Sequence, residues 1–226
     1  MKRYPVNNRV NYILNVCRGK RVLHVGCTDT PNTLRKIEDG TLLHIAIDKV
    51  ASVQYGIDLS EEGITILRNH GFKNLAVVDV QQLASHDPFG NVRFDVVVVG
   101  ETIEHLPNPG LFLDAIKSVL GGADTRLILT TINAYCAARY AYTFFKGGED
   151  VHSDHVAYYS RRTLTKLLTM QGYEIEDFSF YDIGREYTTH WRGLHSGYLL
   201  ISRLFSWFRP EFASGVMVKC KLADSA

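Results

Sequence analysis

The stretch that decides the fold is Arg21-Val22-Leu23-His24-Val25-Gly26-Cys27-Thr28-Asp29. Val22, Leu23 and Val25 form a short apolar run that stops abruptly at Gly26 and a polar loop. A buried parallel strand has this pattern when it delivers a glycine turn to the carboxyl edge of its sheet. Open α/β sheets bind their ligands at that edge, where the strand order reverses. The stretch therefore predicts an α/β sheet and also where its ligand site lies.

The composition is that of an ordinary globular protein. Of the 226 residues, 46% are hydrophobic and 22% are charged, which is enough apolar content for a single domain, residues 1–226. The formal net charge of +1 argues against an extended nucleic-acid interface. Four scattered cysteines without a C-x-x-C pair favour a reducing, cytoplasmic compartment. We see no signal peptide and expect no transmembrane segment.

Strand and helix patterns alternate along most of the chain. Apolar runs or alternation predict strands at 22–25, 53–58, 74–80, 94–99 and 126–131. Helical spacing and capping residues predict helices at 7–16, 33–38, 60–70, 109–120, 134–145 and 160–170. The apolar residues of 42–51 are also spaced as in a helix. This rhythm predicts a doubly wound, mostly parallel seven-stranded sheet, with an antiparallel edge where 173–181 and 215–222 pair.

Acidic residues follow three of the predicted strands: Asp58, Asp79 and Glu101. At such an edge an acid can accept both hydroxyls of a ribose, and an aspartate can accept from the exocyclic amine of adenine. Asp48 has a spacing from Gly26 closer to the roughly 20 residues usual between a glycine turn and its acid. We choose Asp58, because residues 53–58 alternate as a strand and Asp48 lies in a helical pattern.

The ordered motifs resemble those of the class I S-adenosylmethionine-dependent methyltransferases. The matching stretches are Val22-Leu23-His24-Val25-Gly26-Cys27, Ile57-Asp58-Leu59-Ser60, Val78-Asp79-Val80 and residues 94–101 with 103–106. The resemblance implies a Rossmann-like fold with S-adenosylmethionine as cofactor. The cofactor-binding residues that it implies are Gly26, Cys27, Thr28, Asp58, Leu59, Asp79, Val80 and Glu101. Residues 154–160 extend the likeness to a subgroup that methylates small molecules.

One departure concerns the loop after Gly26. The family usually has a second glycine two residues later, where this chain has Thr28. The loop is therefore expected to hold the methionine tail less tightly or to have a different shape. A nicotinamide-binding Rossmann domain is the rival interpretation, and it ranks lower because the third glycine of G-x-G-x-x-G is missing.

Candidate chemical groups follow the fourth strand. Glu101, Glu104 and His105 share a face if the chain turns helical there, and His155 lies further along. This set resembles the metal site of small-RNA 3′-end 2′-O-methyltransferases, which implies Mg²⁺ or another divalent cation on Glu101, Glu104, His105 and His155. In the alternative interpretation, Glu104 and His105 cap and pack the turn and His155 is a lone general base. Both interpretations stay open at this point.

These residues predict methyl transfer to a hydroxyl of a small-molecule acceptor, with His105, His155 and Glu104 as catalytic residues. The alternatives are an RNA 3′-end 2′-O-methyltransferase, which the near-neutral charge disfavours, and a non-catalytic S-adenosylmethionine-binding subunit. Residues 184–214 form an insertion near the sheet edge, and its favoured interpretation is a helix packed on the sheet. A lid over the acceptor, a homodimer surface and a shallow contact with lipid head groups are the functional alternatives.

Overall fold

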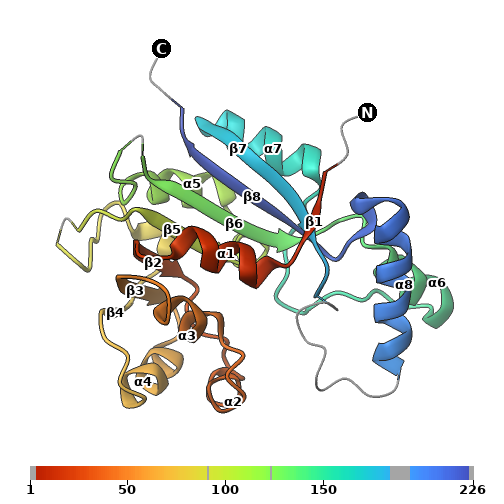
Figure 1. Ribbon diagram of the computed structural model, residues 1–226, viewed down its shortest axis with the longest axis horizontal. Helices are drawn as coiled ribbons and strands as arrows, with labels where there is room; N and C mark the ends of the chain where they lie inside the picture. The colour runs from red at the N-terminus through yellow and green to blue at the C-terminus, as the bar shows by residue number, and fades with distance from the viewer. Residues whose placement is uncertain (1–3, 91, 123, 184–193, 224–226) are drawn as a thin grey trace.

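The computed structural model describes residues 4–90, 92–122, 124–183 and 194–223. Within them, eight strands form one sheet in the order β1-β7-β8-β6-β5-β2-β3-β4 (Figure 1). The strands are β1 (Val6–Asn7), β2 (Arg21–Val25), β3 (Val53–Asp58), β4 (Leu75–Val77), β5 (Val96–Gly100), β6 (Arg126–Ile132), β7 (Tyr173–Tyr181) and β8 (Gly215–Leu222). The predicted fold class, a mostly parallel α/β sheet with an antiparallel strand toward one edge, is confirmed.

Two details differ from the predicted seven-stranded sheet. The eighth strand is the two-residue β1, which pairs in parallel with β7 and covers an edge that would otherwise be unpaired. The antiparallel strand, β8, lies between β6 and β7 and pairs with both of them. Neither detail follows from hydrophobic periodicity, because strand pairing over long sequence distances decides both.

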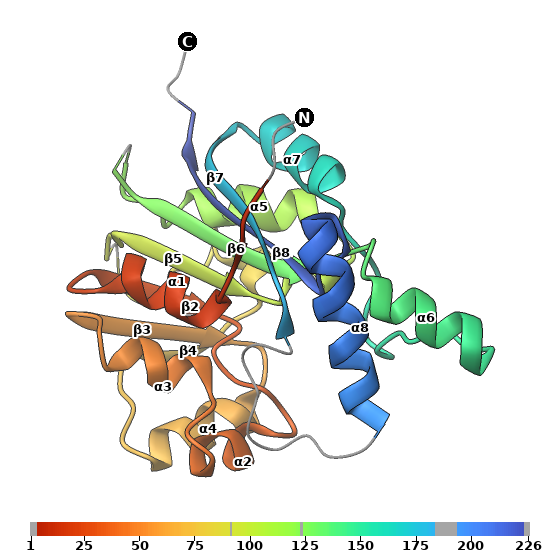
Figure 2. The same cartoon turned by 45° about the vertical axis from the view of Figure 1, so that its right-hand side comes forward.

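Helices cover both faces of the sheet (Figures 1 and 2). They are α1 (Arg9–Cys17), α2 (Thr33–Glu38), α3 (Leu43–Asp48), α4 (Glu61–Asn69), α5 (Pro109–Lys117), α6 (Ala137–Lys146), α7 (Arg161–Met170) and α8 (Leu194–Phe208). On one face, α1 and α3 pack in a core cluster with Val22 and Val98. On the other, α5 and α7 pack in the cluster that contains Leu23 and Val97. Successive residues of these apolar strands thus enter opposite cores, as the pleat requires.

The region around β3 positions the site. The predicted helix within residues 42–51 is confirmed as α3, so Asp48 ends a helix, whereas Asp58 ends β3 beside β2. Ser60 caps α4 by accepting from the backbone N–H of Gly63 at 3.0 Å. The N–H of Gly26 in turn donates to the carbonyl of Ile57 at 2.9 Å. The glycine turn and Asp58 therefore meet at one edge of the sheet.

The insertion between β7 and β8 contains α8 and a short 3₁₀ helix, η4 (Pro210–Phe212). Its first residues, 184–193, lie outside the described part of the chain. Both views show α8 beside α6, at the end of the molecule toward which β6 points (Figures 1 and 2). Of the helices that the structure describes, none is both long enough and apolar enough to cross a membrane.

Candidate active site

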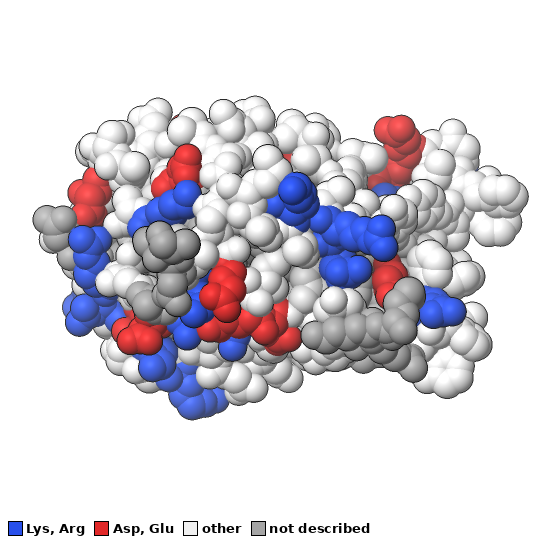
Figure 3. All heavy atoms as spheres, turned by 90° about the horizontal axis from the view of Figure 1, so that it is seen from above, with Lys and Arg blue, Asp and Glu red and all other residues white. Residues whose placement is uncertain are grey.

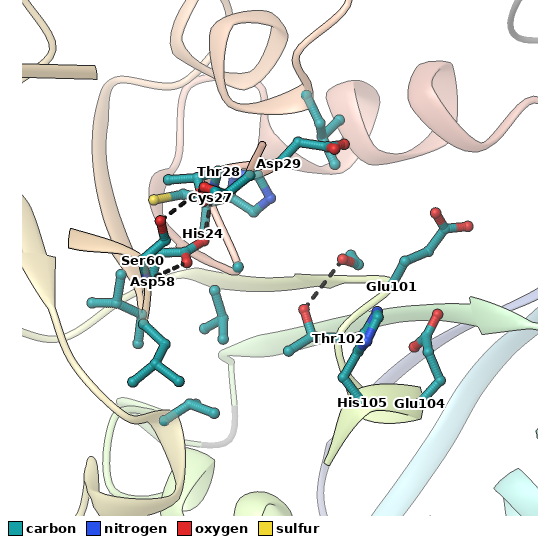
Figure 4. A pocket seen from close by; sticks show the side chains of 18 of the residues that line it. His24, Cys27, Thr28, Asp29, Asp58, Ser60, Glu101, Thr102, Glu104 and His105 are labelled. Carbon is teal, nitrogen blue, oxygen red and sulfur yellow. Dashed lines mark hydrogen bonds between the residues drawn. The ribbon is translucent and has the colours of Figure 1, made fainter. Parts of the chain in front are cut away.

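A cavity of about 810 Å³ opens at the carboxyl ends of β2, β3 and β5. The predicted site residues that line it are Gly26, Cys27, Thr28, Asp58, Leu59, Asp79, Val80, Glu101, Glu104, His105 and His155. The fold thus brings the whole predicted set to one cavity, although its members come from five separate stretches of sequence. Figure 4 shows Asp58 and Thr28 at one side of this cavity and Glu101, Glu104 and His105 at the other.

The glycine turn needs Gly26 for two reasons. Its φ of +70° is one that side chains rarely adopt, and a Cβ there would lie 2.5 Å from Oγ1 of Thr102. Thr28, which stands where the family usually has glycine, packs against α4 so closely that a Cβ on Gly63 would lie 2.7 Å from its side chain. The loop is thus shaped by contact with α4 instead of by a second glycine.

The two strand-end aspartates order their own loops. Asp58 accepts from the backbone N–H groups of Thr28 and Ser60, both at 2.9 Å (Figure 4). Asp79 accepts from the N–H of Gln81 at 2.9 Å and caps the 3₁₀ helix η1 (Val80–Gln82). A carboxylate oxygen has more than one acceptor site, so each aspartate can still accept from a ligand in the cavity. Capping and ligand binding are therefore compatible at both positions.

Glu101 has an unusual backbone and well-defined partners. Its φ is +49°, and its carboxylate accepts from the Tyr181 hydroxyl at 2.6 Å and lies 3.9 Å from the guanidinium of Arg9. Removal from bulk water would raise the pKa of Glu101, but Arg9 and Tyr181 together hold it below its usual value. Glu101 is therefore an anion with a third of its side-chain surface, 33%, still exposed.

Glu104, His105 and His155 form a cluster whose ligand atoms lie within 4.8 Å of one another. The chain does turn helical after β5, as the short 3₁₀ helix η2 (Ile103–His105), and Glu104 is fully buried. Glu101 was expected in this set, but the structure leaves it outside the cluster, bound to Arg9 and Tyr181. The proposed four-residue metal site is thus a three-residue group in the described chain.

Two buried atoms of this cluster lack hydrogen-bond partners among the described residues. Oε2 of Glu104 accepts from the Thr131 hydroxyl at 2.9 Å, but Oε1 has no partner, nor does Nδ1 of His155. Burial, with the nearby charge of Glu101, raises the pKa of Glu104 to about 8. Burial, with the charges of His105 and His152, lowers the pKa of His155 to about 4. Buried polar atoms left unsatisfied are costly, and both of these belong to residues that line the cavity.

Arg9 and Lys36, which were not predicted, also line the cavity. So do His24, which belongs to the first motif, and His152, which precedes His155 by three residues. Lys36 pairs with Asp29 of the glycine loop, and the ring of His152 lies 5.1 Å from that of His155, centroid to centroid. Arg9 and Lys36 belong to helices with no motif, so only the fold could reveal them. Asn133, which follows β6, is buried and donates to the backbone carbonyls of Glu211 and Ala213.

Relatives share both the motifs and the fold. The methyltransferase-domain family matches residues 8–177. A ubiquinone biosynthesis O-methyltransferase of Haemophilus ducreyi is 31% identical over 134 residues, which are 55% of this chain and 52% of that protein. One from Xylella fastidiosa is 34% identical over 124 residues, 53% of this chain and 45% of that protein. The chain therefore spans about half the length of the curated relatives it matches.

Solved structures agree in fold at low sequence identity. A SAM-dependent methyltransferase from Archaeoglobus fulgidus is 17% identical, with a TM-score of 0.60 over 94% of this chain and 91% of that one. The [4+2]-cyclase SpnF is 15% identical, with a TM-score of 0.60 over 98% of this chain and 86% of that one. The fold alone therefore does not decide the reaction. The match over residues 8–177 does decide the family: this chain belongs to the methyltransferase-domain family.

Proposed function

We propose that this protein transfers the methyl group of S-adenosylmethionine to a hydroxyl oxygen of a small-molecule acceptor. One observation carries the proposal: a single cavity joins the acidic strand ends Asp58 and Asp79 to the unsatisfied polar atoms of Glu104 and His155. The first pair suits a nucleoside, and the second suits a hydroxyl that must lose its proton. The O-methyltransferase names of the relatives favour oxygen as the methyl acceptor.

The proposed cofactor pose follows the order of the strand ends. Asp58 accepts from the ribose hydroxyls, Asp79 accepts from the adenine amine, and the methionine tail lies along the turn at Gly26. The exposed side chain of Leu59 and the buried Val80 supply apolar contact with the nucleoside. The Glu101 carboxylate then faces the positive end of the cofactor, where an anion is favourable.

The transfer itself needs an oxygen aligned with the bond that breaks. The acceptor oxygen forms a bond to the methyl carbon, and the carbon–sulfur bond breaks with its electron pair going to sulfur. The products are the methyl ether and S-adenosylhomocysteine. The hydroxyl proton goes to Nδ1 of His155, whose imidazole is neutral near pH 7 and has no hydrogen-bond partner at that nitrogen among the described residues.

A divalent cation fits the same cluster. Glu104, His105 and His155 offer one carboxylate and two imidazoles, a donor set that suits Mn²⁺, Fe²⁺ or Zn²⁺ better than the oxygen-preferring Mg²⁺. Such an ion, when bound, would lower the pKa of an acceptor hydroxyl. The unsatisfied Oε1 of Glu104 supports this site, since a carboxylate oxygen left without a partner in a buried position is a ready ligand.

Calorimetry with S-adenosylmethionine tests the cofactor assignment. We expect wild-type protein to bind and Asp58→Ala to bind at least tenfold more weakly, since a charge-assisted contact of about 1.5–3 kcal/mol is lost. Glu62→Ala, which removes an exposed acid of α4, is the matched control. Wild-type protein that releases no heat with S-adenosylmethionine would end the proposal.

Turnover tests the reaction class. S-adenosylhomocysteine release should be measured with a catechol, a phenol, a sugar and a short RNA as acceptors. Methyl ether formation on a small hydroxylated acceptor supports the proposal, and release with RNA alone supports the 2′-O-methyltransferase alternative. Cofactor binding without turnover on any acceptor would favour a binding subunit.

A further inference from the structure

Helix α8 is inverted relative to an ordinary surface helix. Two of its serines, Ser202 and Ser206, are 0% and 1% exposed, whereas Leu200 and Trp207 are 66% and 67% exposed. A surface helix normally buries its apolar stripe and exposes its polar side chains. Over residues 200–208, where the side chains are described, the two serines face the protein, and leucine and aromatic side chains face outward together with Arg203.

A buried carboxylate holds the serines of α8 toward the protein. Asp182 follows β7 and is 1% exposed. Its two oxygens accept from the hydroxyls of Ser202 at 2.9 Å, Ser206 at 3.3 Å and Ser214 at 3.1 Å. Asp182 directly follows β7, Ser202 and Ser206 lie in α8, and Ser214 directly precedes β8. These hydrogen bonds therefore fix the rotation of α8 about its axis.

The outward side of α8 joins an equally apolar surface on the neighbouring helix α6. Leu200, Leu204, Trp207 and Phe208 recur at helical spacing along α8, and Tyr140 and Phe144 are one turn apart on α6. Phe144 is 82% exposed, and Phe145 beside it is 77% exposed. We call these two helical surfaces the α6/α8 patch. Figure 3 shows the end of the molecule where these helices lie as largely uncharged.

The charges around the patch indicate what it contacts. The sequences of α6 and of residues 194–209 contain no aspartate or glutamate, and the exposed cations Lys146, Arg203 and Arg209 lie in or beside the two helices. Acidic residues begin only in the turns that follow, at 149–150 and at Glu211. Aromatic and aliphatic side chains bordered by lysine and arginine are the signature of a surface that lies in the interface of an anionic membrane.

We infer that the α6/α8 patch binds the surface of an anionic lipid bilayer, with its apolar side chains inserted to the level of the head groups. This binding is a surface contact, consistent with the lack of a membrane-crossing helix among those described. Helix α6 also lies close to the cavity in the chain: its Arg139 donates to the carbonyls of Asn133 and Asp150, which stand one and two residues from the lining residues Ile132 and His152. A docked protein would therefore hold its active site close to the membrane.

Co-sedimentation with vesicles of phosphatidylcholine and phosphatidylglycerol in a 3:1 ratio tests this inference. We expect wild-type protein to sediment with them and to bind pure phosphatidylcholine more weakly. Phe144→Ser with Trp207→Ser should lower binding by roughly tenfold or more, because two large apolar side chains are lost. Leu111→Ser with Met170→Ser, which removes exposed apolar residues of α5 and α7, is the matched control and should bind as wild type does.

Fluorescence gives a second readout at the patch itself. The sequence has two tryptophans, so Trp191→Phe leaves Trp207 as the sole emitter. Its emission should shift to the blue when anionic vesicles are added. Wild-type protein that stays in the supernatant, or an equal loss of binding in the α5/α7 control, would overturn the inference.

A second copy of the chain is the competing occupant. A dimer in vesicle-free solution that the Phe144→Ser, Trp207→Ser variant abolishes would assign the patch to self-association and reject the membrane. Calorimetry of the same variant with S-adenosylmethionine separates the membrane inference from the proposed function. Because the patch lies outside the cofactor-binding residues, the affinity of this variant for S-adenosylmethionine should be unchanged.

Discussion

The hydroxyl of Tyr181 donates a 2.6 Å hydrogen bond to Glu101, although 80 residues separate the two in the sequence. Tyr181 ends β7 and pairs with Gly215 of β8, while Glu101 follows β5. A Cβ on Gly215 would lie 2.0 Å from Cζ of the Tyr181 ring. Because Gly215 has no side chain, the ring of Tyr181 can pack over it. The Tyr181 hydroxyl, which comes from the other half of the sheet, thereby reaches Glu101 in the active site.

Gly215→Ala should therefore disturb the site as well as the fold. The added methyl group cannot coexist with the Tyr181 ring, and such overpacking typically costs about 1–3 kcal/mol. Tyr181→Phe keeps the ring and removes the hydrogen bond to a charged group, a loss of about 1.5–3 kcal/mol. Urea denaturation measures both changes, and calorimetry should show weaker S-adenosylmethionine binding in each. Gly148→Ala, at an exposed glycine with open space around it, is the control and should have no effect.

Alanine substitutions at Gly26 and Gly40 distinguish the cost of backbone strain from an effect on cofactor binding, because the two glycines have nearly the same φ. Gly26 and Gly40 have φ values of +70° and +67°, but a Cβ at Gly40 meets nothing within 4 Å. Alanine at either position should cost about 1 kcal/mol in unfolding free energy for the left-handed backbone. Gly26→Ala should in addition lose S-adenosylmethionine affinity, because its methyl group collides with Thr102 and displaces the turn. Equal cofactor affinities of the two variants in calorimetry would contradict this role of the turn.

A buried histidine pair should make the protein sensitive to acid. Nδ1 of His24 lies 3.2 Å from Nδ1 of His44, which is also 2.9 Å from the amide nitrogen of Gln54. His44 Nδ1 therefore accepts, which requires a neutral His44 ring, and His24 Nδ1 donates. Burial lowers the pKa of His44 to about 4, and it lowers the pKa of His24 well below 6.5.

The sign of the effect follows from proton uptake. Below pH 6.5 the unfolded chain binds a proton at His44 that the folded protein does not bind until about pH 4, so stability present at pH 7 is lost on acidification. His44 contributes a loss of about 2 kcal/mol between pH 7 and pH 5, and the lowered pKa of His24 acts in the same direction. Urea denaturation should show a shallower pH slope in His44→Gln, whereas His70→Gln, at an exposed histidine, should keep the wild-type slope. A His44→Gln slope as steep as that of wild type would refute the assignment.

The Glu104–His155 cluster should matter for turnover more than for cofactor binding. His155→Asn should lower kcat by about 100-fold or more, in the range for loss of a proton acceptor, and Glu104→Gln should lower it because an amide is a weaker ligand for a divalent cation than a carboxylate. Their affinity for S-adenosylmethionine should stay near that of wild type. His86→Asn, at an exposed histidine, is the control.

Chelation then divides the two interpretations of this cluster. If a bound cation assists the reaction, removing it with EDTA should abolish activity, and Mn²⁺ should restore it in wild type but not in His155→Asn. Activity that survives EDTA but is lost in His155→Asn would assign His155 as a lone base. Full activity in both variants would clear the cluster of any catalytic part.

The sequence by itself determined the parts of this protein that depend on local patterns. The apolar run before Gly26, the alternation of residues 53–58 and the capped helix after Ser60 follow from backbone periodicity and turn chemistry. Those rules also place Asp58 and Asp79 at strand ends, and parallel strands bring their carboxyl ends to one edge. The fold class and the family could therefore be predicted before any coordinates were known.

The tertiary structure decided what depends on contacts between distant segments. In the folded protein, Glu101 contacts Tyr181 and Arg9 and lies outside the cluster of Glu104. His24 and His44 lie side by side in the core. It also turned the serines of α8 toward Asp182, whereas the apolar run of that segment alone favoured burial against the sheet. The physical reason is that periodicity fixes which residues share a side of a helix or strand. Which side is buried depends on the element that packs against it. For α8 that side is set by the carboxylate of Asp182, directly after β7.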